Sequence, residues 1–408
     1  MTPSSIDALP PEILAEIILY SPTPRLCSQP SWTTVPWSQN WTRLRLVSHQ
    51  WNSIILDTPQ LWSHLTIHID PKSLRNPTTS SVELWLRSSR SLPLNLEFSV
   101  ENRDPLISQM DRHVSDVLDL LWKEVDRWRT IHFVLETRRS EMWAQANRSL
   151  LNARMLEFFG LTYVDLRPGS RDAIEATMRA IAAAPALHAL QIDSFNWSVL
   201  GAIRRELELK RLTRLDLFIC VDDLSNVYTL LQECPSLLSV YLRIWCQVQE
   251  EYLYSVPRIH LPNLRVFFAE CDLPMHLENL LSPLLAPKLE LLSFHFPPPP
   301  DSWGSPLLSV STFPTSLCVL SLSELNEDQI ISLFSDSRLA HIPVVEVGVG
   351  SVKEDELEEV RDLVENWVDF KGNLEIEDLG RLWVVGWKDP AVFVQFNEYF
   401  AHPWTELA

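Results

Sequence analysis

The sequence predicts a mixed α/β chain, in which a short N-terminal helical domain precedes an irregular, right-handed solenoid of strand–helix repeats with a C-terminal cap. Three observations support this prediction. Two apolar patches with helical spacing lie in the first 65 residues. A strand-like pattern then recurs every 25 to 28 residues, and amphipathic segments separate its copies. From residue 346 the chain leaves this period, as expected of a segment that covers the last apolar layer of a repeat array.

The N-terminal domain, residues 1–65, contains two short predicted helices. Pro11 suits a first helical position, where an amide hydrogen is not needed for the helix. One face of the first helix is shared by Ile13, Leu14 and Ile17. One stripe of the second helix holds Leu44, Val47, Trp51 and Ile54. Two helices of this size bury too small a core to be stable alone.

Three motifs follow one another in this domain: Leu9-Pro10-x-Glu12-Ile13-Leu14, Val47-Ser48-His49-x-Trp51 and Thr58-Pro59-x-Leu61-Trp62. Together they resemble an F-box over roughly the first 65 residues. The resemblance implies that this domain docks on a Skp1-type adaptor and, through it, joins a cullin. The docking residues that it implies are Leu9, Pro10, Ile13, Leu14, Ile17, Leu44, Val47 and Trp51.

The two halves of this domain lie farther apart in the sequence than in a compact F-box. The segment from Ser21 to Trp41 contains four prolines, which forbid a continuous helix. We therefore predict an inserted loop at about residues 21–41.

Residues 66–160 are predicted to form a linker and the first irregular repeats. Alternation of apolar and polar residues predicts a strand over 61–69, and polar residues interrupt the pattern at 71–80. Beyond this break, helix and strand alternate twice, at 82–89, 92–98, 111–127 and 128–135.

Residues 161–345 show an explicit repeat. The pattern apolar-x-x-apolar-x-apolar begins at Leu161, Leu187, Leu212, Leu237, Leu264, Leu289 and Leu317. In four units a proline two residues upstream ends the preceding helix. Helical spacing between the strands is seen, for example, at Leu224, Val227 and Leu231, and at Leu277, Leu280 and Leu284. One strand and one helix per unit resemble the leucine-rich repeat, which implies a horseshoe with the strands on its concave side.

Residues 346–408 are predicted to form a terminal repeat and cap. Ser351-x-x-Glu354 is a capping-box pattern that opens a helix. Two strands follow, at 382–387 and 392–396.

The repeat strands also predict a target-binding surface. Alternation directs the fifth and seventh positions of each repeat to the concave side. Exposed aromatic and arginine side chains supply most binding hot spots. The predicted target-binding residues are Asp216, Phe218, Tyr241, Arg243, Phe268 and Glu270. The alternative is that these side chains cover their own strands or pack on a loop.

The composition limits the partners and the compartment. A formal net charge of -19, a pI near 5.0 and the absence of a basic run argue against nucleic acid. The sequence has neither a signal-peptide pattern nor an apolar window long enough to span a membrane. Its six cysteines include no C-x-x-C pair and are expected to be reduced. We therefore expect an intracellular protein, in the cytoplasm, the nucleus or both.

No motif points to catalysis, a cofactor or a metal. No serine has nucleophile-elbow glycines around it, and no triad with fixed spacing is present. His64 and His68 have metal-compatible spacing only on a helix, whereas their segment is predicted to be a strand. The run Pro297–Pro300 could bind an SH3 or WW partner, but it falls where a strand must turn, so a stiff loop is favoured. We expect no enzymatic activity.

These features lead to two hypotheses. In the first, the chain is a non-catalytic substrate-recognition adaptor of an SCF-type (Skp1–cullin–F-box) ubiquitin ligase, and the solenoid binds an unidentified protein substrate. In the alternative, the chain is a leucine-rich-repeat scaffold without coupling to a ligase, and its N-terminal helices only cap the solenoid.

Overall fold

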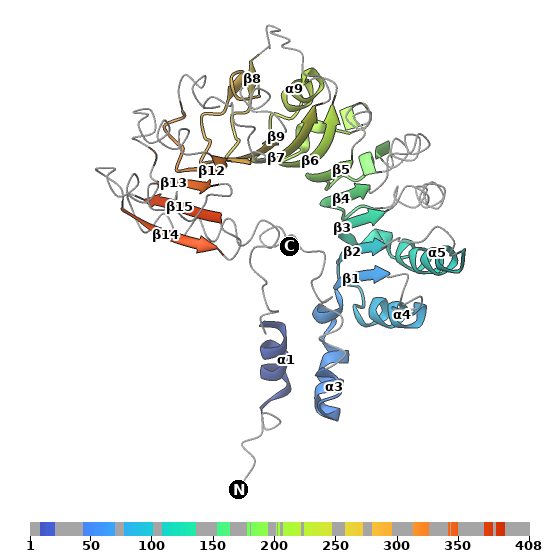
Figure 1. The fold of residues 1–408 in the computed structure, drawn as a ribbon. Coiled ribbons are helices and arrows are strands. Elements are labelled where there is room, and N and C mark those ends of the chain that lie inside the picture. Colours follow the sequence, from blue (N-terminus) through green and yellow to red (C-terminus); the bar gives the residue numbers. More distant parts are fainter. Residues whose placement is uncertain are drawn as a thin grey trace. The chain divides into compact units, whose positions relative to one another are not determined.

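The computed structural model combines a short N-terminal helical region with a large parallel sheet, so the predicted mixed α/β class is confirmed (Figure 1). The chain divides into two compact units, Met1–Leu187 and His188–Leu407. The structure describes residues 9–20, 44–69, 77–100, 108–135, 153–163, 178–179, 181–194, 201, 203–204, 207–221, 224–246, 258–271, 280–295, 313–325, 342, 344–349, 371–377 and 381–387.

The N-terminal region of unit 1 consists of α1 (Pro11–Tyr20), α3 (His49–Asp57) and the 3₁₀ helix η2 (Pro59–Trp62). Both predicted helices are therefore present, and α1 packs beside α3 (Figure 1). The Ser48 hydroxyl caps α3 by accepting a 3.3 Å hydrogen bond from the Trp51 amide. The predicted loop at 21–41 lies outside the described residues.

Four parallel strands follow in unit 1, in the spatial order β1 (His64–Ile69), β2 (Leu94–Val100), β3 (Trp128–Leu135) and β4 (Phe158–Tyr163). The connections contain α4 (Thr79–Ser88), α5 (Ser108–Trp122) and the 3₁₀ helix η4 (Val125–Arg127). These elements confirm the predicted helices and strands up to residue 135, with small shifts of their ends. The predicted strand over 61–69 begins only at His64, because Pro59–Trp62 closes a 3₁₀ turn first.

The first predicted repeat was out of phase. We expected its strand to bury Leu161, Val164 and Leu166, but β4 ends at Tyr163. Its buried side chains are Leu156, Phe159 and Leu161. Both sets fit the same apolar spacing, and pairing with β3 selects the earlier one, since Ile131 lies opposite Phe159 and Phe133 opposite Leu161. Val164 and Leu166 lie outside the described residues.

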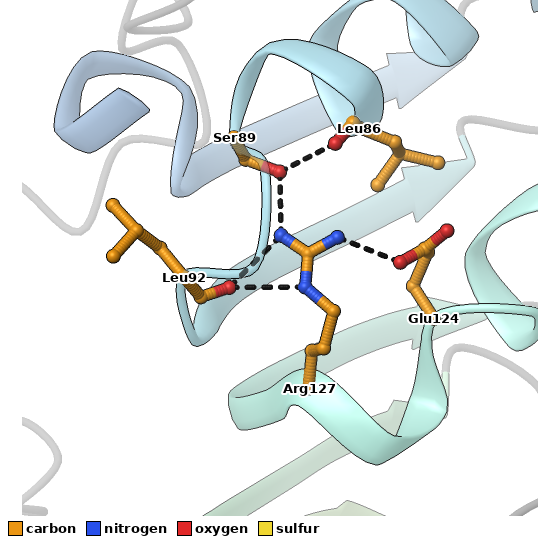
Figure 2. A network of polar contacts seen from close by, with 5 residues as sticks. All are labelled: Leu86, Ser89, Leu92, Glu124 and Arg127. Carbon is orange, nitrogen blue, oxygen red and sulfur yellow. Dashed lines mark hydrogen bonds and ion pairs between the residues drawn. The ribbon is translucent and has the colours of Figure 1, made fainter. Parts of the chain in front are cut away.

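A polar network joins consecutive repeats of unit 1 (Figure 2). The Arg127 guanidinium donates to the Ser89 hydroxyl at 2.7 Å and to the Leu92 carbonyl at 2.9 and 3.1 Å. It also forms a 2.6 Å ion pair with Glu124. The Ser89 hydroxyl in turn donates to the Leu86 carbonyl at 2.6 Å. One side chain from η4 thereby satisfies backbone groups at the C-terminal end of α4.

The core of unit 2 is a parallel sheet with the strand order β5 (Ala189–Ser194), β6 (Arg214–Val221), β7 (Ser239–Cys246), β9 (Val266–Cys271), β11 (Leu291–His295), β12 (Val319–Leu325) and β13 (Val344–Val349). The fourth and sixth positions of the predicted repeats, from Leu190 to Leu322, are at most 2% exposed in the first six of these strands. The predicted phase is therefore confirmed from the second repeat onward.

The connections of unit 2 confirm one predicted helix and correct another. The helix α9 (Ser225–Gln232) buries Val227 and Leu231, as its spacing predicted. Leu284 was expected on a helix, but Leu284–Leu285 forms the short strand β10, which pairs with β8 (Ile259–His260). The Ile259 amide donates to the Pro283 carbonyl at 2.8 Å, and this pairing with a neighbouring connection replaces the helix.

The parallel order ends at β13, which pairs antiparallel with β15 (Arg381–Trp387), and β15 pairs antiparallel with β14 (Lys371–Glu377). The predicted strand at 382–387 is confirmed, and β14 was missed. The predicted helix after Ser351 and the predicted strand at 392–396 lie outside the described residues. No helix in the described part of the chain is both long and apolar enough to cross a membrane.

Candidate functional site

The N-terminal helices are held together by a small apolar core. Leu14 from α1 and Ile55 from α3 have no exposed surface, and Trp51 is 8% exposed. The Trp62 indole, 2% exposed, donates a 2.7 Å hydrogen bond to the Ile55 carbonyl. This bond fixes η2 against α3, because a buried indole N–H needs an acceptor.

The same helices present apolar side chains to solvent. Ile13 and Ile17 on α1 are 47% and 40% exposed, and Leu46 and Val47 before α3 are 86% and 58% exposed. Pro10 is exposed as well. We call these five residues the helical face. Large apolar side chains that gather at one place on a surface mark interaction sites more often than single ones do.

The structure divides the predicted docking residues into two groups. Pro10, Ile13, Ile17 and Val47 belong to the helical face, and Leu9 and Leu44 are half-buried. Leu14 and Trp51 instead lie in the core between the helices, so they support the face without being part of it. Leu46, the most exposed of the large apolar residues described, was not predicted; it lies directly beside Val47 but off the helical stripe.

The predicted target-binding residues come together on one side of the sheet in unit 2. Parallel register places Gln191, Asp216, Tyr241 and Phe268 side by side on four adjacent strands. Two residues further along, a second row holds Asp193, Phe218, Arg243 and Glu270. We call these eight residues the strand face. Tyr241, Phe268, Phe218, Arg243 and Glu270 are half-buried, whereas the other three are buried.

Aromatic and cationic groups on the strand face contact one another. The rings of Tyr241 and Phe268 stack with centroids 6.0 Å apart. The Arg243 guanidinium lies 4.7 Å from the Phe218 ring centroid and 3.6 Å from an Asp193 carboxylate oxygen. These contacts partly support the alternative that the side chains cover their own strands, yet each of the three named aromatic rings keeps exposed area.

Burial shapes the charges of the strand face. It raises the pKa of Asp193 to about 6, against the opposing influence of Arg243 and with a further rise from Asp216. Burial also raises the pKa of Asp216, although Arg243 and Arg214 favour its charged form. Both carboxylates are therefore incompletely compensated by the arginines beside them.

Trp245 extends the strand face and was missed from the sequence. It lies two residues beyond Arg243 on β7, is 49% exposed, and meets the Phe218 ring edge-on at 6.1 Å. The signal was present, because the same alternation that selected Tyr241 and Arg243 reaches Trp245 at the next step.

The corresponding side of the sheet in unit 1 is polar and rich in histidine. The His64 ring accepts from the Asn95 amide at 2.7 Å, His68 contacts the Ser99 hydroxyl at 2.9 Å, and His132 contacts Thr162 at 3.1 Å. We call these six residues the histidine face. Burial lowers the pKa of His132 to about 4 and also lowers that of His64, where Arg129 adds to the effect.

Metal and thiol chemistry gain no support. His64 and His68 lie on a strand, as predicted, and each contacts a neighbouring side chain. Within the described ranges, no group of three or more His, Cys, Asp or Glu could hold a metal ion. Cys234 and Cys271 are buried, and burial raises the pKa of Cys234 to about 12, so its nucleophilic thiolate form is suppressed. Pro297–Pro300 lies outside the described residues.

One family model matches the chain. It is described as F-box-like and covers residues 6–68, which contain α1, α3, η2 and the whole helical face. No curated protein sequence matches the chain.

Proposed function

From an F-box-like segment that exposes an apolar face, we propose that this chain is the substrate-recognition adaptor of an SCF-type ubiquitin ligase. F-box domains generally bind Skp1, and the match at 6–68 suggests this role here. The single observation that carries the proposal is the helical face, where four large apolar side chains are 40–86% exposed within the matched segment.

The physical driving force of docking is removal of these side chains from water. Fully burying an isoleucine, leucine or valine side chain contributes about 1.5–3 kcal/mol. The helical face has its own support, since Leu14 and Trp51 fix α1 against α3 beneath it. A face that is held in place before binding loses little conformational entropy on docking. Half-buried Leu9 and Leu44 would complete the rim of the contact.

The remainder of the chain would hold the target. We propose that its strands belong to an irregular leucine-rich-repeat solenoid. Parallel strands whose buried positions recur at Leu190, Leu215, Val240 and Phe267 support this assignment. The strand face would bind the substrate protein, a cullin would be reached through the Skp1-type adaptor, and ubiquitin transfer would be carried out by those partners. The chain itself would be non-catalytic and would act in the cytoplasm, the nucleus or both.

The test is binding of purified full-length protein to a Skp1-type adaptor, measured by isothermal titration calorimetry. The substitutions Leu46→Asp and Val47→Asp place a charge on the helical face and should each weaken binding about a hundredfold, which corresponds to the loss of about 2–3 kcal/mol at a hot spot. Leu285→Asp is the matched control, because Leu285 is an exposed leucine, 42% accessible, in unit 2.

Two results would contradict this proposal. One is the absence of binding by the wild-type chain, and the other is equal binding by the helical-face variants and the Leu285→Asp control. Either result would favour the scaffold alternative, in which the N-terminal helices only cap the repeats. The buried Trp62 side chain, at the end of η2 and directly before β1, is the observation that supports such a cap.

A further inference from the structure

The strand face has an unequal supply of hydrogen-bond donors and acceptors. Its carboxylates are Asp193, Asp216 and Glu270, and its one guanidinium is that of Arg243. Arg243 is already engaged, because it lies over the Phe218 ring and pairs with Asp193. The capacity that remains for a partner therefore consists mainly of acceptors.

Gln191 provides an independent sign of the same imbalance. Its side chain is 8% exposed, and its Oε1 is a buried acceptor with no hydrogen-bond partner among the described residues. It lies beside Asp216 in the parallel register and on the side of β5 opposite to buried Leu190 and Ile192. A buried acceptor without a donor is rare in folded proteins, and a bound donor is one way to satisfy it.

Glu270 marks the other end of the strand face. Within the part of the chain that the structure describes, its half-buried carboxylate makes neither a hydrogen bond nor an ion pair. Phe268 precedes it by two residues on β9 and therefore lies on the same side, stacked on Tyr241. A carboxylate next to an exposed aromatic ring suits an ammonium or guanidinium group, which gains from both.

We infer that the strand face recognises a basic segment of the target protein, with a lysine or arginine side chain seated against Phe268 and Tyr241 between Glu270 and the Gln191–Asp216 pair. The inference rests on the proposed function and adds the chemical class of its substrate. Charge complementarity extends beyond the site, since the chain carries a formal net charge of -19. An acidic segment would need Arg243 to leave Asp193 and would meet three carboxylates.

The experiment selects peptides from a random twelve-residue library, displayed on phage, with immobilised full-length protein. We expect lysine and arginine to be enriched over the input library. A selected peptide, synthesised with a fluorescent label, should bind Glu270→Gln about tenfold more weakly than the wild type, as expected for loss of one charge-assisted hydrogen bond. Asp216→Asn should weaken it in the same direction and serves as a second variant with nearly unchanged volume.

The controls separate this inference from the proposed function. The Leu46→Asp variant should select the same peptides, because the helical face is not involved. Wild-type circular dichroism and melting temperature are required of each variant. Enrichment of acidic peptides, enrichment of no charged residue, or equal affinity of the selected peptide for wild type and Glu270→Gln would each overturn the inference. None of these outcomes would alter binding of the Skp1-type adaptor.

Discussion

The histidine face of unit 1 and the strand face of unit 2 are built alike but are satisfied differently. In both, adjacent parallel strands bring side chains at matching positions together. On the histidine face, His64 pairs with Asn95 and His132 with Thr162 across neighbouring strands. On the strand face, Gln191 and Glu270 keep acceptors without donors among the described residues. One register can thus close a surface on itself or leave it open to a partner.

The repeats of the two units also differ in length. Equivalent buried positions in unit 1, Leu65, Leu96 and Ile131, are separated by 31 and 35 residues. In unit 2, Leu215, Val240 and Phe267 are separated by 25 and 27 residues. The additional residues of unit 1 provide the long helix α5 and the turn that holds Arg127. Longer connections therefore come with the internal polar network of Figure 2.

The largest expected effect comes from removing this network. Arg127→Ala should lower the free energy of unfolding of unit 1 by about 2–4 kcal/mol, because the substitution leaves buried acceptors and a partly buried carboxylate without a donor. The Arg127 side chain is 14% exposed and that of Glu124 31%. The measurement is urea denaturation, followed by hydrogen exchange of the β2 and β3 amides.

Unit 2 offers a matched control for this substitution. Arg211 ends the 3₁₀ helix η6 (Leu209–Arg211) and pairs with Glu208 at 2.7 Å, in the same i,i+3 arrangement as Arg127 and Glu124. These side chains are 52% and 67% exposed, so Arg211→Ala should cost less than about 1 kcal/mol. Equal losses from the two substitutions would show that burial does not separate the two units in this respect.

Acid should separate the two faces by sign. The pKa of His132 is lowered from 6.5 to about 4, so its contribution to stability is full above pH 6.5 and is lost as the pH falls towards 4. The pKa of Asp193 is raised from 3.8 to about 6, so its contribution is full below 3.8 and is lost as the pH rises towards 6. From pH 7 to pH 5, His132 should therefore destabilise unit 1 by about 2 kcal/mol, and Asp193 should modestly stabilise unit 2.

Single substitutions isolate these contributions. His132→Gln should remove the acid-induced loss from the β3 amides, and Asp193→Asn should remove the gain from the β6 amides, both measured as opening free energies by hydrogen exchange. His260→Gln is a control, because His260 is exposed on β8. A His132→Gln variant with the pH dependence of the wild type would refute the assignment for unit 1.

Local patterns in the sequence predicted most elements but not which side chains would meet. Spacing identified α3, α4, β2 and most strands of unit 2, because burial of one face imposes a period. It could not choose between Leu156 and Leu161 as the start of a repeat, since both fit and only pairing with β3 decides. It also could not distinguish Leu14, which is buried, from Ile13, which is exposed, because both lie on the predicted apolar face of α1.

Contacts between distant residues were the least predictable. Arg127 and Ser89 are separated by 38 positions, and nothing in either local sequence announces their hydrogen bond. The same holds for Trp62, whose indole reaches the Ile55 carbonyl over seven positions. By contrast, the aromatic and charged residues of the strand face were predicted from alternation alone, because parallel register converts a period along the chain into a row across strands.

The smallest expected effect tests the turn next to the Figure 2 network. Arg90 follows the C-cap Ser89 of α4 and has a φ of 52°, a left-handed conformation that favours glycine. Arg90→Gly should raise the free energy of unfolding by about 0.5–1 kcal/mol, since relief of a strain of about 1–2 kcal/mol exceeds the entropy lost by a more flexible unfolded chain. The ion pair between Arg90 and Asp57 is 3.5 Å long and well exposed, so its loss should offset little. The measurement is the urea midpoint, with Arg90→Ala as the control that loses the ion pair and keeps the strain. A lower midpoint for Arg90→Gly than for Arg90→Ala would show that the turn gains nothing from glycine, and that the left-handed residue is already well accommodated by the network around Ser89.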